Sequence, residues 1–351
     1  MHQQPFAKPD HPQTRAALSS RLHGELHGTD APLGRLAAAE SATPTDVVCL
    51  LRTKDKDIVA RTLACAAEVL VVAQPYETTK TQIVVPDIEV AWLELLRIYR
   101  QPRRPKYIHP SASIHPSAKI GENVEIGAFV CIEADVQIGA GSIIEAHSMI
   151  GERSSLGSGC YLHERSTVRH DCHLGNGVLV QSGAVIGADG YGFHRHNGYI
   201  RQEQIGAVFI GDHVEIGATT VIDRGTLEPT RIGNGTKIGP ACVVAHNCQL
   251  GENVVLIGQV GLTGSIEVGD GAILWGQTGT IGHVRIGKNA VLTACSSLSK
   301  SIPDGEVWRG APAQPIRDEL RQEAQVRRLG EYEARIKELE LQLKTLVADN
   351  R

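Results

Sequence analysis

The sequence predicts a mainly β protein built around a parallel β-helix, and two observations carry this prediction. From Ile108 onward an aliphatic residue recurs every six positions, as in IGENVE, IGAFVC and IEADVQ. Small residues often follow it and turn formers occupy the middle, which is the signature of hexapeptide coils. The composition agrees, because 37 glycines and only 4% aromatic residues suit a narrow interior filled by small aliphatic side chains.

The chain of 351 residues has room for two or three domains. We expect residues 1–20, which are polar and rich in proline, to form a loose arm. Residues 21–100 predict a small α/β domain, with strands at 69–72 and 81–85 and helices at 58–65 and 90–99. The stretch 101–107, which begins Gln-Pro-Arg-Arg-Pro, predicts a stiff linker.

The β-helix is expected over residues 108–303. The six-residue phase holds from Ile108 to Ile186 and again from Ile232 to Leu298. The segment at about 192–204 is too polar and too long for a coil, so we expect it to be a loop ejected from the prism. Three hexapeptides make one triangular coil, so positions 18 residues apart should stack about 4.8 Å from each other. The length then gives about ten coils, and we expect them to be left-handed, as is usual for hexapeptide proteins.

The remaining residues, 304–351, predict a helical extension. Helix-forming residues dominate from Ile316, and apolar residues recur in steps of three and four. Such a seam needs a partner, most simply the same helix of neighbouring subunits. Gly330 suggests a bend or a join between two helices. The seam consists of Leu329, Tyr332, Ile336, Leu339, Leu343 and Leu346.

Bulk properties exclude several classes of function. The formal charge of -4 and the lack of a basic stripe argue against a nucleic-acid partner. The sequence has no apolar run of 18 residues and no signal-peptide pattern at Met1, so we expect no membrane span. The eight cysteines are scattered without a CxxC pair, which is typical of reduced thiols in a cytoplasmic protein.

His246 is the first candidate for chemistry. It follows two apolar residues in VVAHNCQL, and Gly264 lies 18 residues later, one coil on. A histidine beside a backbone N–H of the next coil suits acyl transfer: the imidazole takes a proton from the nucleophile, and the N–H holds the oxyanion. A solvated histidine on the outside of the prism fits the spacing equally well.

The other histidines leave alternatives open. His283, 37 residues after His246, either faces the same cleft or is simply exposed. His194 and His196 either line a substrate entrance or are solvated loop residues. The group His163, His170, Cys172 and His173 contains zinc-type ligands, but no pair repeats the spacing of a zinc motif, so we expect no metal site.

Several stretches together resemble one family, the UDP-3-O-acylglucosamine N-acyltransferases of lipid A synthesis. They are SGAVIGADGYGF (182–193), VEIGATTVIDRGTL (214–227), VAHN (244–247), GQVGLTGS (258–265), GQTGTIGHVRIG (276–287) and KSIPDGEVWRGAPAQP (300–315). The resemblance covers nearly the whole chain. It implies a cytoplasmic homotrimer with active sites between its subunits.

The resemblance also implies a reaction and a set of site residues. The 2-amine of a UDP-linked 3-O-acylglucosamine would attack a 3-hydroxyacyl thioester on acyl-carrier protein, with His246 as base, Gly264 N–H as oxyanion donor and His283 orienting substrate. No metal or organic cofactor is implied beyond the carrier's phosphopantetheine. Implied substrate-binding residues are Asn247, Asp189, Tyr191, Phe193, Asp223, Arg224, Gln259 and Gln277. Candidate carrier-docking residues are Lys300, Arg309, Arg317 and Arg321.

The chain departs from the family pattern at three places, one of which is Trp275, where the family has a small residue before Gly-Gln. Cys49, Arg52 and Asp55 stand where the family has Phe, Asn and Tyr to grip uracil. Gly239-Pro240 replaces Asp-Asn before the catalytic histidine, so an acidic group near His246 is expected to be missing. The alternatives are therefore a hexapeptide acyltransferase for another amino sugar or amine, a non-catalytic trimeric scaffold, or a metal-dependent hydratase. Acyl-chain length and the physiological acceptor do not follow from these residues.

Overall fold

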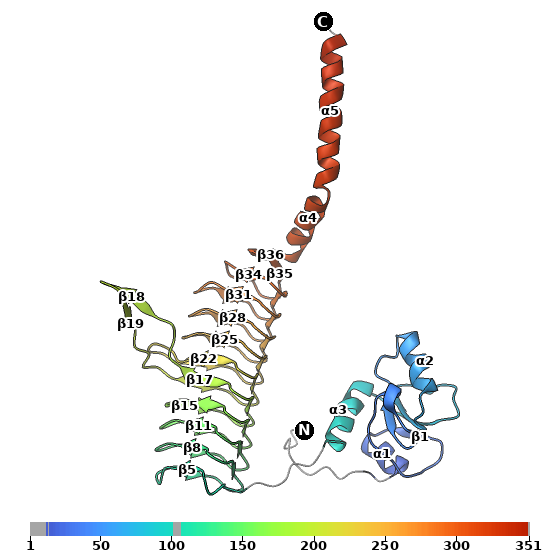
Figure 1. Ribbon diagram of the computed structural model, residues 1–351, viewed down its shortest axis with the longest axis vertical. Coiled ribbons are helices and arrows are strands. Elements are labelled where there is room, and N and C mark those ends of the chain that lie inside the picture. Colours follow the sequence, from blue (N-terminus) through green and yellow to red (C-terminus); the bar gives the residue numbers. More distant parts are fainter. Residues whose placement is uncertain (1–11, 13, 101–106, 350–351) are drawn as a thin grey trace. The chain divides into compact units, whose positions relative to one another are not determined.

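A computed structural model describes residues 12, 14–100 and 107–349 (Figure 1). It divides the chain into two compact units, residues 1–104 and 105–351. Each unit has its own hydrophobic core. The predicted linker lies outside the described residues except for Tyr107.

The first unit is a four-stranded sheet with helices. The sheet order is β1-β4-β3-β2, in which β1 is antiparallel to β4 and the other pairs are parallel. Asp55 and Asp87 cap α2 and α3 by accepting hydrogen bonds from N–H groups of the first turn. The strands are β1 (Glu25–His27), β2 (Val47–Cys49), β3 (Val69–Val72) and β4 (Thr81–Val84); the helices are α1 (Arg15–Arg21), η1 (Ala39–Ser41), α2 (Lys56–Ala64) and α3 (Ile88–Ile98).

The expected loose arm is wrong from residue 14 onward. Thr14 forms a β-bridge with Pro32 and caps α1. Leu18 in α1 is fully buried in the core of the first unit. The helix folds because burying Leu18 and Leu22 against the sheet outweighs the entropy cost of ordering the polar residues of this short helix. Residues 1–11 and 13 lie outside the described residues.

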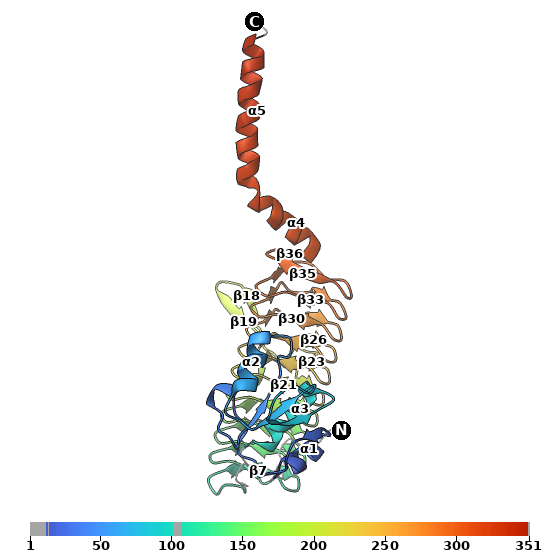
Figure 2. The same ribbon diagram turned by 90° about the vertical axis from the view of Figure 1, so that its right-hand side faces the viewer.

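The second unit is a parallel β-helix whose three sides are parallel sheets of short strands (Figures 1 and 2). Sheet I contains β7 (Glu125–Ile126), β10 (Ile143–Ile144), β13 (Tyr161–Leu162), β16 (Leu179–Val180), β21 (Glu215–Ile216), β24 (Lys237–Ile238), β27 (Val255–Leu256), β30 (Ile273–Leu274), β33 (Val291–Leu292), β35 (Val307–Gly310) and β36 (Ala313–Pro315). Sheet II contains β5 (Ser113–Ile114), β8 (Cys131–Ile132), β11 (Met149–Ile150), β14 (Thr167–Val168), β17 (Val185–Ala188), β22 (Val221–Asp223), β25 (Val243–Val244), β28 (Gly261–Leu262), β31 (Gly279–Thr280) and β34 (Ser297–Leu298). Sheet III contains β6 (Lys119–Ile120), β9 (Gln137–Ile138), β12 (Ser155–Leu156), β15 (Cys172–Leu174), β20 (Val208–Ile210), β23 (Thr230–Ile232), β26 (Gln249–Leu250), β29 (Glu267–Val268) and β32 (Arg285–Ile286).

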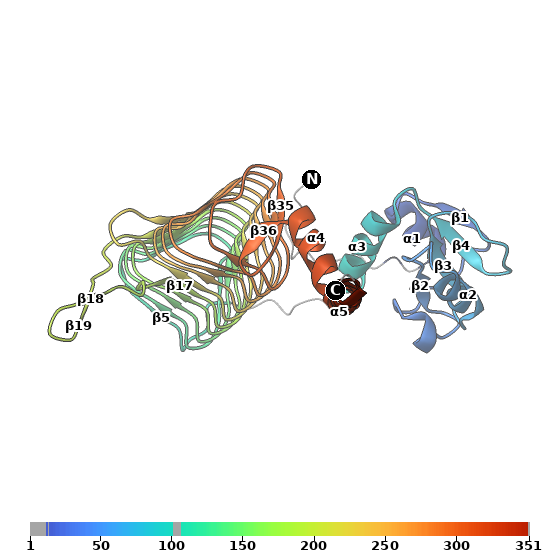
Figure 3. The same ribbon diagram turned by 90° about the horizontal axis from the view of Figure 1, so that it is seen from above.

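The fold is the predicted left-handed β-helix, and the strand register confirms its 18-residue coils. Ile144 pairs with Ile126 on one side and with Leu162 on the other, and the coils overlie one another when viewed from above (Figure 3). All three side chains are at most 1% exposed. Each such burial is worth about 1.5–3 kcal/mol relative to exposure, so the aliphatic ladder holds the coils together.

The three corners of the prism differ in what they carry. We call the turn from sheet II to sheet III the His246 corner, and the turn from sheet I to sheet II the Gln259 corner. The predicted ejected loop takes the form of an antiparallel hairpin at the His246 corner, made of β18 (Phe193–Arg195) and β19 (Tyr199–Arg201). It projects away from the stacked coils (Figure 1).

The boundary expected at residue 303 is wrong, because residues 304–315 continue the prism. β35 pairs with β33, and Trp308 in β35 is only 4% exposed at the end of the core. β36 then folds back antiparallel on β35 and covers the last edge. α4 (Ile316–Arg327) packs against β35 and β36 (Figure 2).

The tail forms two helices, α4 and α5 (Leu329–Asp349), which join at Arg328, two residues before Gly330. The seam residues described in α5, from Leu329 to Leu343, are exposed in the single chain. The side chain of Leu346 lies outside the described residues. Among the described residues, no helix combines the length and apolar character needed to cross a membrane.

The ladder makes a stability prediction within the two-residue strand β27. Leu256 is 1% exposed, whereas Val255 points outward and is half-buried. Leu256→Ala should lower the free energy of unfolding by about 2–5 kcal/mol through lost burial and a cavity. Val255→Ala should cost less than about 1 kcal/mol. Equal losses in urea unfolding would contradict an interior built from this ladder.

Candidate active site

Three successive turns of the His246 corner carry irregular or polar structure. The first is the hairpin segment between β17 and β20, and the second is the loop between β22 and β23, which holds the short insertion at 228–231. The third is the turn between β25 and β26, which contains His246 and Asn247. Because β17, β22 and β25 are neighbours in sheet II, both interruptions lie on the coils just before His246.

His246 lies flat against Gly264 of the next coil. A Cβ atom at Gly264 would lie 2.6 Å from Cε1 and 2.7 Å from Nε2 of the ring, so the ring keeps this position only while residue 264 is glycine. The Gly264 N–H finds no hydrogen-bond acceptor among the described residues. A free backbone donor next to an imidazole nitrogen is the arrangement that base and oxyanion donor require.

Asn247 determines which nitrogen of His246 is protonated. The backbone N–H of Thr226 donates to Asn247 Oδ1 over 3.1 Å, and Asn247 Nδ2 donates to the Glu228 carbonyl over 2.9 Å. The amide oxygen therefore faces His246 Nδ1, at 3.0 Å. An amide oxygen only accepts, so Nδ1 carries the proton and Nε2 keeps its lone pair.

Asp223 is an acidic neighbour of His246, which corrects the expectation that this group is missing. It is 8% exposed, and burial raises its pKa to about 6, with the charge of Asp189 adding to the rise and that of His246 opposing it. Gly239 and Pro240 lie at the Gln259 corner, at the other end of β25. Side chains at those positions would lie at a different corner from His246 of the same chain.

Arg224 is not available to bind substrate, contrary to the expectation. It is 1% exposed and donates to the carbonyl oxygens of Gly187 (3.0 Å), His170 (2.8 Å) and Gly206 (3.3 Å). These contacts tie together both ends of the hairpin segment and the coil below it. The role of Arg224 is therefore to hold the hairpin root in place.

The hairpin root itself contacts His246. A Cβ atom at Gly190 would lie 2.8 Å from the Cβ of His246, so the chain after Asp189 passes directly against the histidine. Tyr191 and Phe193 follow, both exposed, with their rings edge-on at 4.9 Å. Asp189, Tyr191 and Phe193 thus lie on the same corner as His246. Sequence reasoning could have found the contact by counting coils across the hairpin.

The remaining candidates are spread over the prism. His283 is exposed at the His246 corner two coils beyond it, and its N–H donates to the Gly264 carbonyl over 3.4 Å. Gln259 and Gln277 hydrogen-bond each other over 2.9 Å at the Gln259 corner. A single chain therefore does not bring these two glutamines to His246.

The candidate carrier-docking cations lie at the last coils and on α4. Arg309 pairs with Glu323 at 3.0 Å and Arg321 with Asp318 at 3.7 Å, while Lys300 lies over the ring of Trp308. Arg317 is exposed on the first turn of α4.

The residues that could have ligated zinc contact different neighbours. His170 contacts Asp171 and Arg224, whereas His173 stacks on Phe209. Cys172 is buried in the prism core. Within the described ranges, no three His, Cys, Asp or Glu side chains form a cluster able to hold a metal ion.

At the positions where the family grips uracil, this chain has Cys49, Arg52 and Asp55 instead. Cys49 ends β2 and is partly buried, and burial raises its pKa to about 12. Asp55 accepts hydrogen bonds from the N–H groups of Asp57 and Ile58 and so caps α2. Neither side chain offers an aromatic face for a base.

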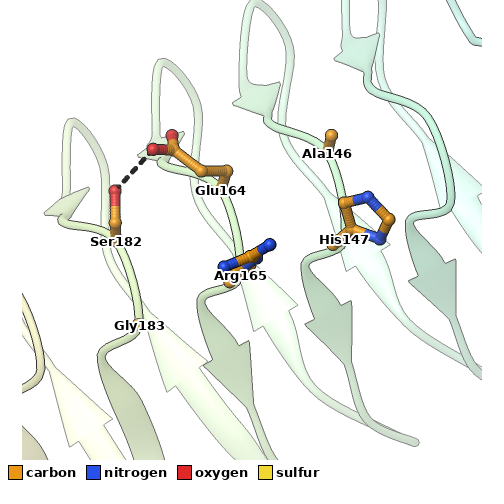
Figure 4. Close-up of a pocket in the computed structure, with 6 residues that line it drawn as sticks. All are labelled: Ala146, His147, Glu164, Arg165, Ser182 and Gly183. Carbon is orange, nitrogen blue, oxygen red and sulfur yellow. Dashed lines mark hydrogen bonds between the residues drawn. The ribbon is translucent and has the colours of Figure 1, made fainter.

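An open groove of about 490 Å³ lies elsewhere, along the first coils of the Gln259 corner (Figure 4). Glu164 accepts a hydrogen bond from Ser182 across it, at 3.0 Å. Its lining residues are Ala146, His147, Glu164, Arg165, Ser182 and Gly183.

Comparisons with known proteins identify the family. A UDP-3-O-acylglucosamine N-acyltransferase of Pseudomonas syringae pv. syringae (strain B728a) is 37% identical over 338 residues, 95% of each chain. The chain belongs to the UDP-3-O-acylglucosamine N-acyltransferase family. Membership confirms the predicted family and the prediction that the chain is an acyltransferase.

A further relative has the same description, whereas two family models and a solved structure match parts of the chain more broadly. The enzyme of the same description from Chlorobium chlorochromatii (strain CaD3) is 55% identical over 171 residues, 48% of each chain. Two family models match: the GMPPB C-terminal domain over residues 103–191, and the bacterial transferase hexapeptide (six repeats) over residues 229–264. Among solved structures, Arabidopsis UDP-N-acetylglucosamine acyltransferase aligns with a TM-score of 0.56 and 25% identity, covering 59% of this chain and 73% of that one.

The Asn247 contact can be tested without straining the backbone. Asn247 has a φ of 63°, which glycine adopts freely and aspartate tolerates. Asn247→Gly removes the acceptor for His246 Nδ1–H and should lower kcat by up to about 100-fold. Asn247→Asp keeps a hydrogen-bond acceptor for His246 Nδ1–H, so its kcat should stay closer to that of the parent. Similar rates for parent and glycine variant in an acyl-transfer assay would rule out the orienting role.

Asp223 predicts a pH dependence. Its pKa rises from an ordinary 3.8 to about 6, so the carboxyl is charged only above about pH 6. There it favours the imidazolium that forms when His246 takes a proton. Asp223→Asn should therefore reduce kcat/KM most above pH 6, and the reduction should fade as the pH falls through 6.

The same group sets a stability trend. Between about pH 4 and 6 only the folded state holds the extra proton, and the stability that this provides is lost as the pH rises through 6. The free energy of unfolding of Asp223→Asn, measured relative to that of the parent, should therefore be higher at pH 8 than at pH 5. Denaturation curves of both proteins at pH 5 and pH 8 test this. A difference in unfolding free energy between variant and parent that does not change with pH would contradict the prediction.

Proposed function

We propose that the protein transfers a 3-hydroxyacyl chain from acyl-carrier protein to the 2-amine of UDP-3-O-acylglucosamine, in lipid A synthesis. The observation that carries the proposal is the placement of His246 against Gly264, with Nδ1 held by Asn247. Family membership supports the acceptor, because the relative with 95% coverage is named for it.

The geometry suggests the following steps. As the amine nitrogen attacks the thioester carbonyl carbon, His246 Nε2 removes a proton from that amine. The Gly264 N–H stabilises the resulting oxyanion, and Asp223 stabilises the imidazolium. Collapse of the intermediate forms the amide and breaks the C–S bond, and the imidazolium returns its proton to the leaving thiolate of the phosphopantetheine arm. No metal or further cofactor takes part.

A homotrimer would complete the site. Gln259 and Gln277 lie at another corner of the same chain, so they reach a His246 only from a neighbouring subunit. The exposed apolar residues of α5 supply a surface for pairing the tails. Lys300, Arg309, Arg317 and Arg321 at the far end of the prism would dock the acidic carrier.

A second candidate is acylation of another amine by the same machinery. The observation that favours it is the absence of aromatic side chains at Cys49 and Asp55, where the family grips uracil. Assaying the purified protein with UDP-3-O-acylglucosamine and a panel of acyl-carrier thioesters separates the two. Carrier thioester turnover only with a different amine would support the second candidate.

His246→Ala should lower the transfer rate by about 10²- to 10⁴-fold, because the base is lost while the fold is kept. His115→Ala is the matched control, since His115 is exposed at the same corner near the start of the prism. Turnover by His246→Ala at the control's rate would show that another group is the base.

Gly264→Ala should reduce transfer by about 100-fold or more, since its Cβ would displace the His246 ring from beside the N–H donor. Stability should change little, because the clash is with a side chain that can move. Gly261→Ala, where a Cβ would meet nothing within 4 Å, is the control. Transfer rates and melting curves are measured for both variants. Equal transfer rates for Gly264→Ala and Gly261→Ala would contradict the prediction.

A further inference from the structure

Three arginines converge on a single carboxylate at the hairpin root. Asp189 Oδ1 lies 3.8 Å from Arg224 Nε and 4.0 Å from Arg169 Nη2, and Asp189 Oδ2 accepts a hydrogen bond from Arg201. The arginines come from three separate segments: Arg169 follows β14, Arg201 ends β19 and Arg224 follows β22. The cluster therefore exists only in the folded prism.

The positive charge in this cluster exceeds the negative charge. Three guanidinium groups face the Asp189 carboxylate, so they outnumber the negative charges even when the neighbouring Asp223 is also charged. Arg224 is buried and uses its donors on backbone carbonyls. Arg169 and Arg201 have side chains that are 42% and 54% exposed, so solvent or a ligand can reach them.

Both exposed arginines have unused donors. Within the described ranges, the Arg169 guanidinium makes no hydrogen bond, since its contact with Asp189 at 4.0 Å is too long for one. Toward the part of the chain that the structure describes, the Arg201 side chain hydrogen-bonds only through Nη2, so most of its five donors remain unused there. A pair of guanidinium groups with free donors suits the oxygens of a phosphate, which they bind in a bidentate manner.

The cluster lies beside the proposed base. Gly190, which follows Asp189, packs on the His246 side chain, and Asp223 is coupled by charge to both Asp189 and His246. A phosphate held here would anchor its molecule close to the reacting atoms. The first unit offers no aromatic grip at Cys49 and Asp55, so an anchor elsewhere would have particular value for this chain.

We infer that Arg169 and Arg201 form a phosphate-binding site that holds a substrate next to His246. The inference rests on the proposed function, in which both substrates carry phosphate. One source is the diphosphate of the nucleotide sugar, and the other is the phosphodiester of the carrier's phosphopantetheine arm.

The test uses Arg169→Gln, Arg201→Gln and the double variant of the full chain. Lys237→Gln is the control, because Lys237 is also a half-exposed cation paired to one carboxylate, Glu215, but lies in sheet I. Each arginine variant should raise one KM by about tenfold, the effect of losing a charge-assisted hydrogen bond, with little change in kcat. Arg169→Lys and Arg201→Lys, which keep the charge, should recover part of the loss.

The substrate whose KM rises in the arginine variants shows which of the two phosphates occupies the site. A higher KM for the UDP sugar alone assigns the site to the diphosphate. A higher KM for the donor, present with acyl-phosphopantetheine and absent with acyl-pantetheine, assigns it to the arm. If both KM values in the double variant match those of Lys237→Gln, the inference is overturned.

Binding measurements keep this test separate from the proposed function. If the parent protein transfers no acyl group to any amine, the proposed function fails, and calorimetric titration with UDP and with 4′-phosphopantetheine decides the site. Binding by the parent that is lost in the double variant supports the inference. Binding that is absent in the parent, or unchanged in the double variant, overturns it.

Discussion

The stacking of one coil on the next at an 18-residue interval is the constraint on which the rest of the structure depends. Parallel pairing of each short strand with the strand one coil away fixes both the rise and the rotation of the prism. A strand of two residues is not stable alone, so its position is determined by the strands on either side and by the ladder of buried aliphatic residues. That rigidity is why His246 and Gly264, which are distant in the sequence, meet in a fixed geometry.

The candidate site arises where the repeat is broken. On two consecutive coils the His246 corner departs from the six-residue pattern, first by the hairpin and then by the loop before β23. The loop supplies the Thr226 N–H and Glu228 carbonyl that orient Asn247, and the hairpin root packs Gly190 on His246. The interruptions thus surround a histidine that would otherwise be one corner residue among many, and His246 is partly buried there.

Buried charge at this corner has two different roles. Arg224 donates hydrogen bonds to carbonyl oxygens and pairs with the charge of Asp189, so it stabilises the hairpin root without facing a substrate. Among the described residues, no group donates a hydrogen bond to the Asp223 carboxyl, and burial therefore raises its pKa and makes its charge responsive to pH near 6. An acid of this kind beside a general base can stabilise the imidazolium that forms during catalysis.

The sequence by itself determined the coil length, the parallel β-helix, the ejected segment and the pairing of His246 with Gly264, because a strict six-residue period converts separation along the chain into position in space. It could not place Arg224 or Asp223 correctly, because their roles depend on burial by the hairpin and the neighbouring coil. It also missed the final β35–β36 hairpin, since Trp308 and the prolines around it break the repeat while still covering the end of the core. Only the tertiary structure decided which groups surround His246, because the loop before β23 and the hairpin root follow no repeat that would fix the positions of the Thr226 N–H, the Glu228 carbonyl and Gly190.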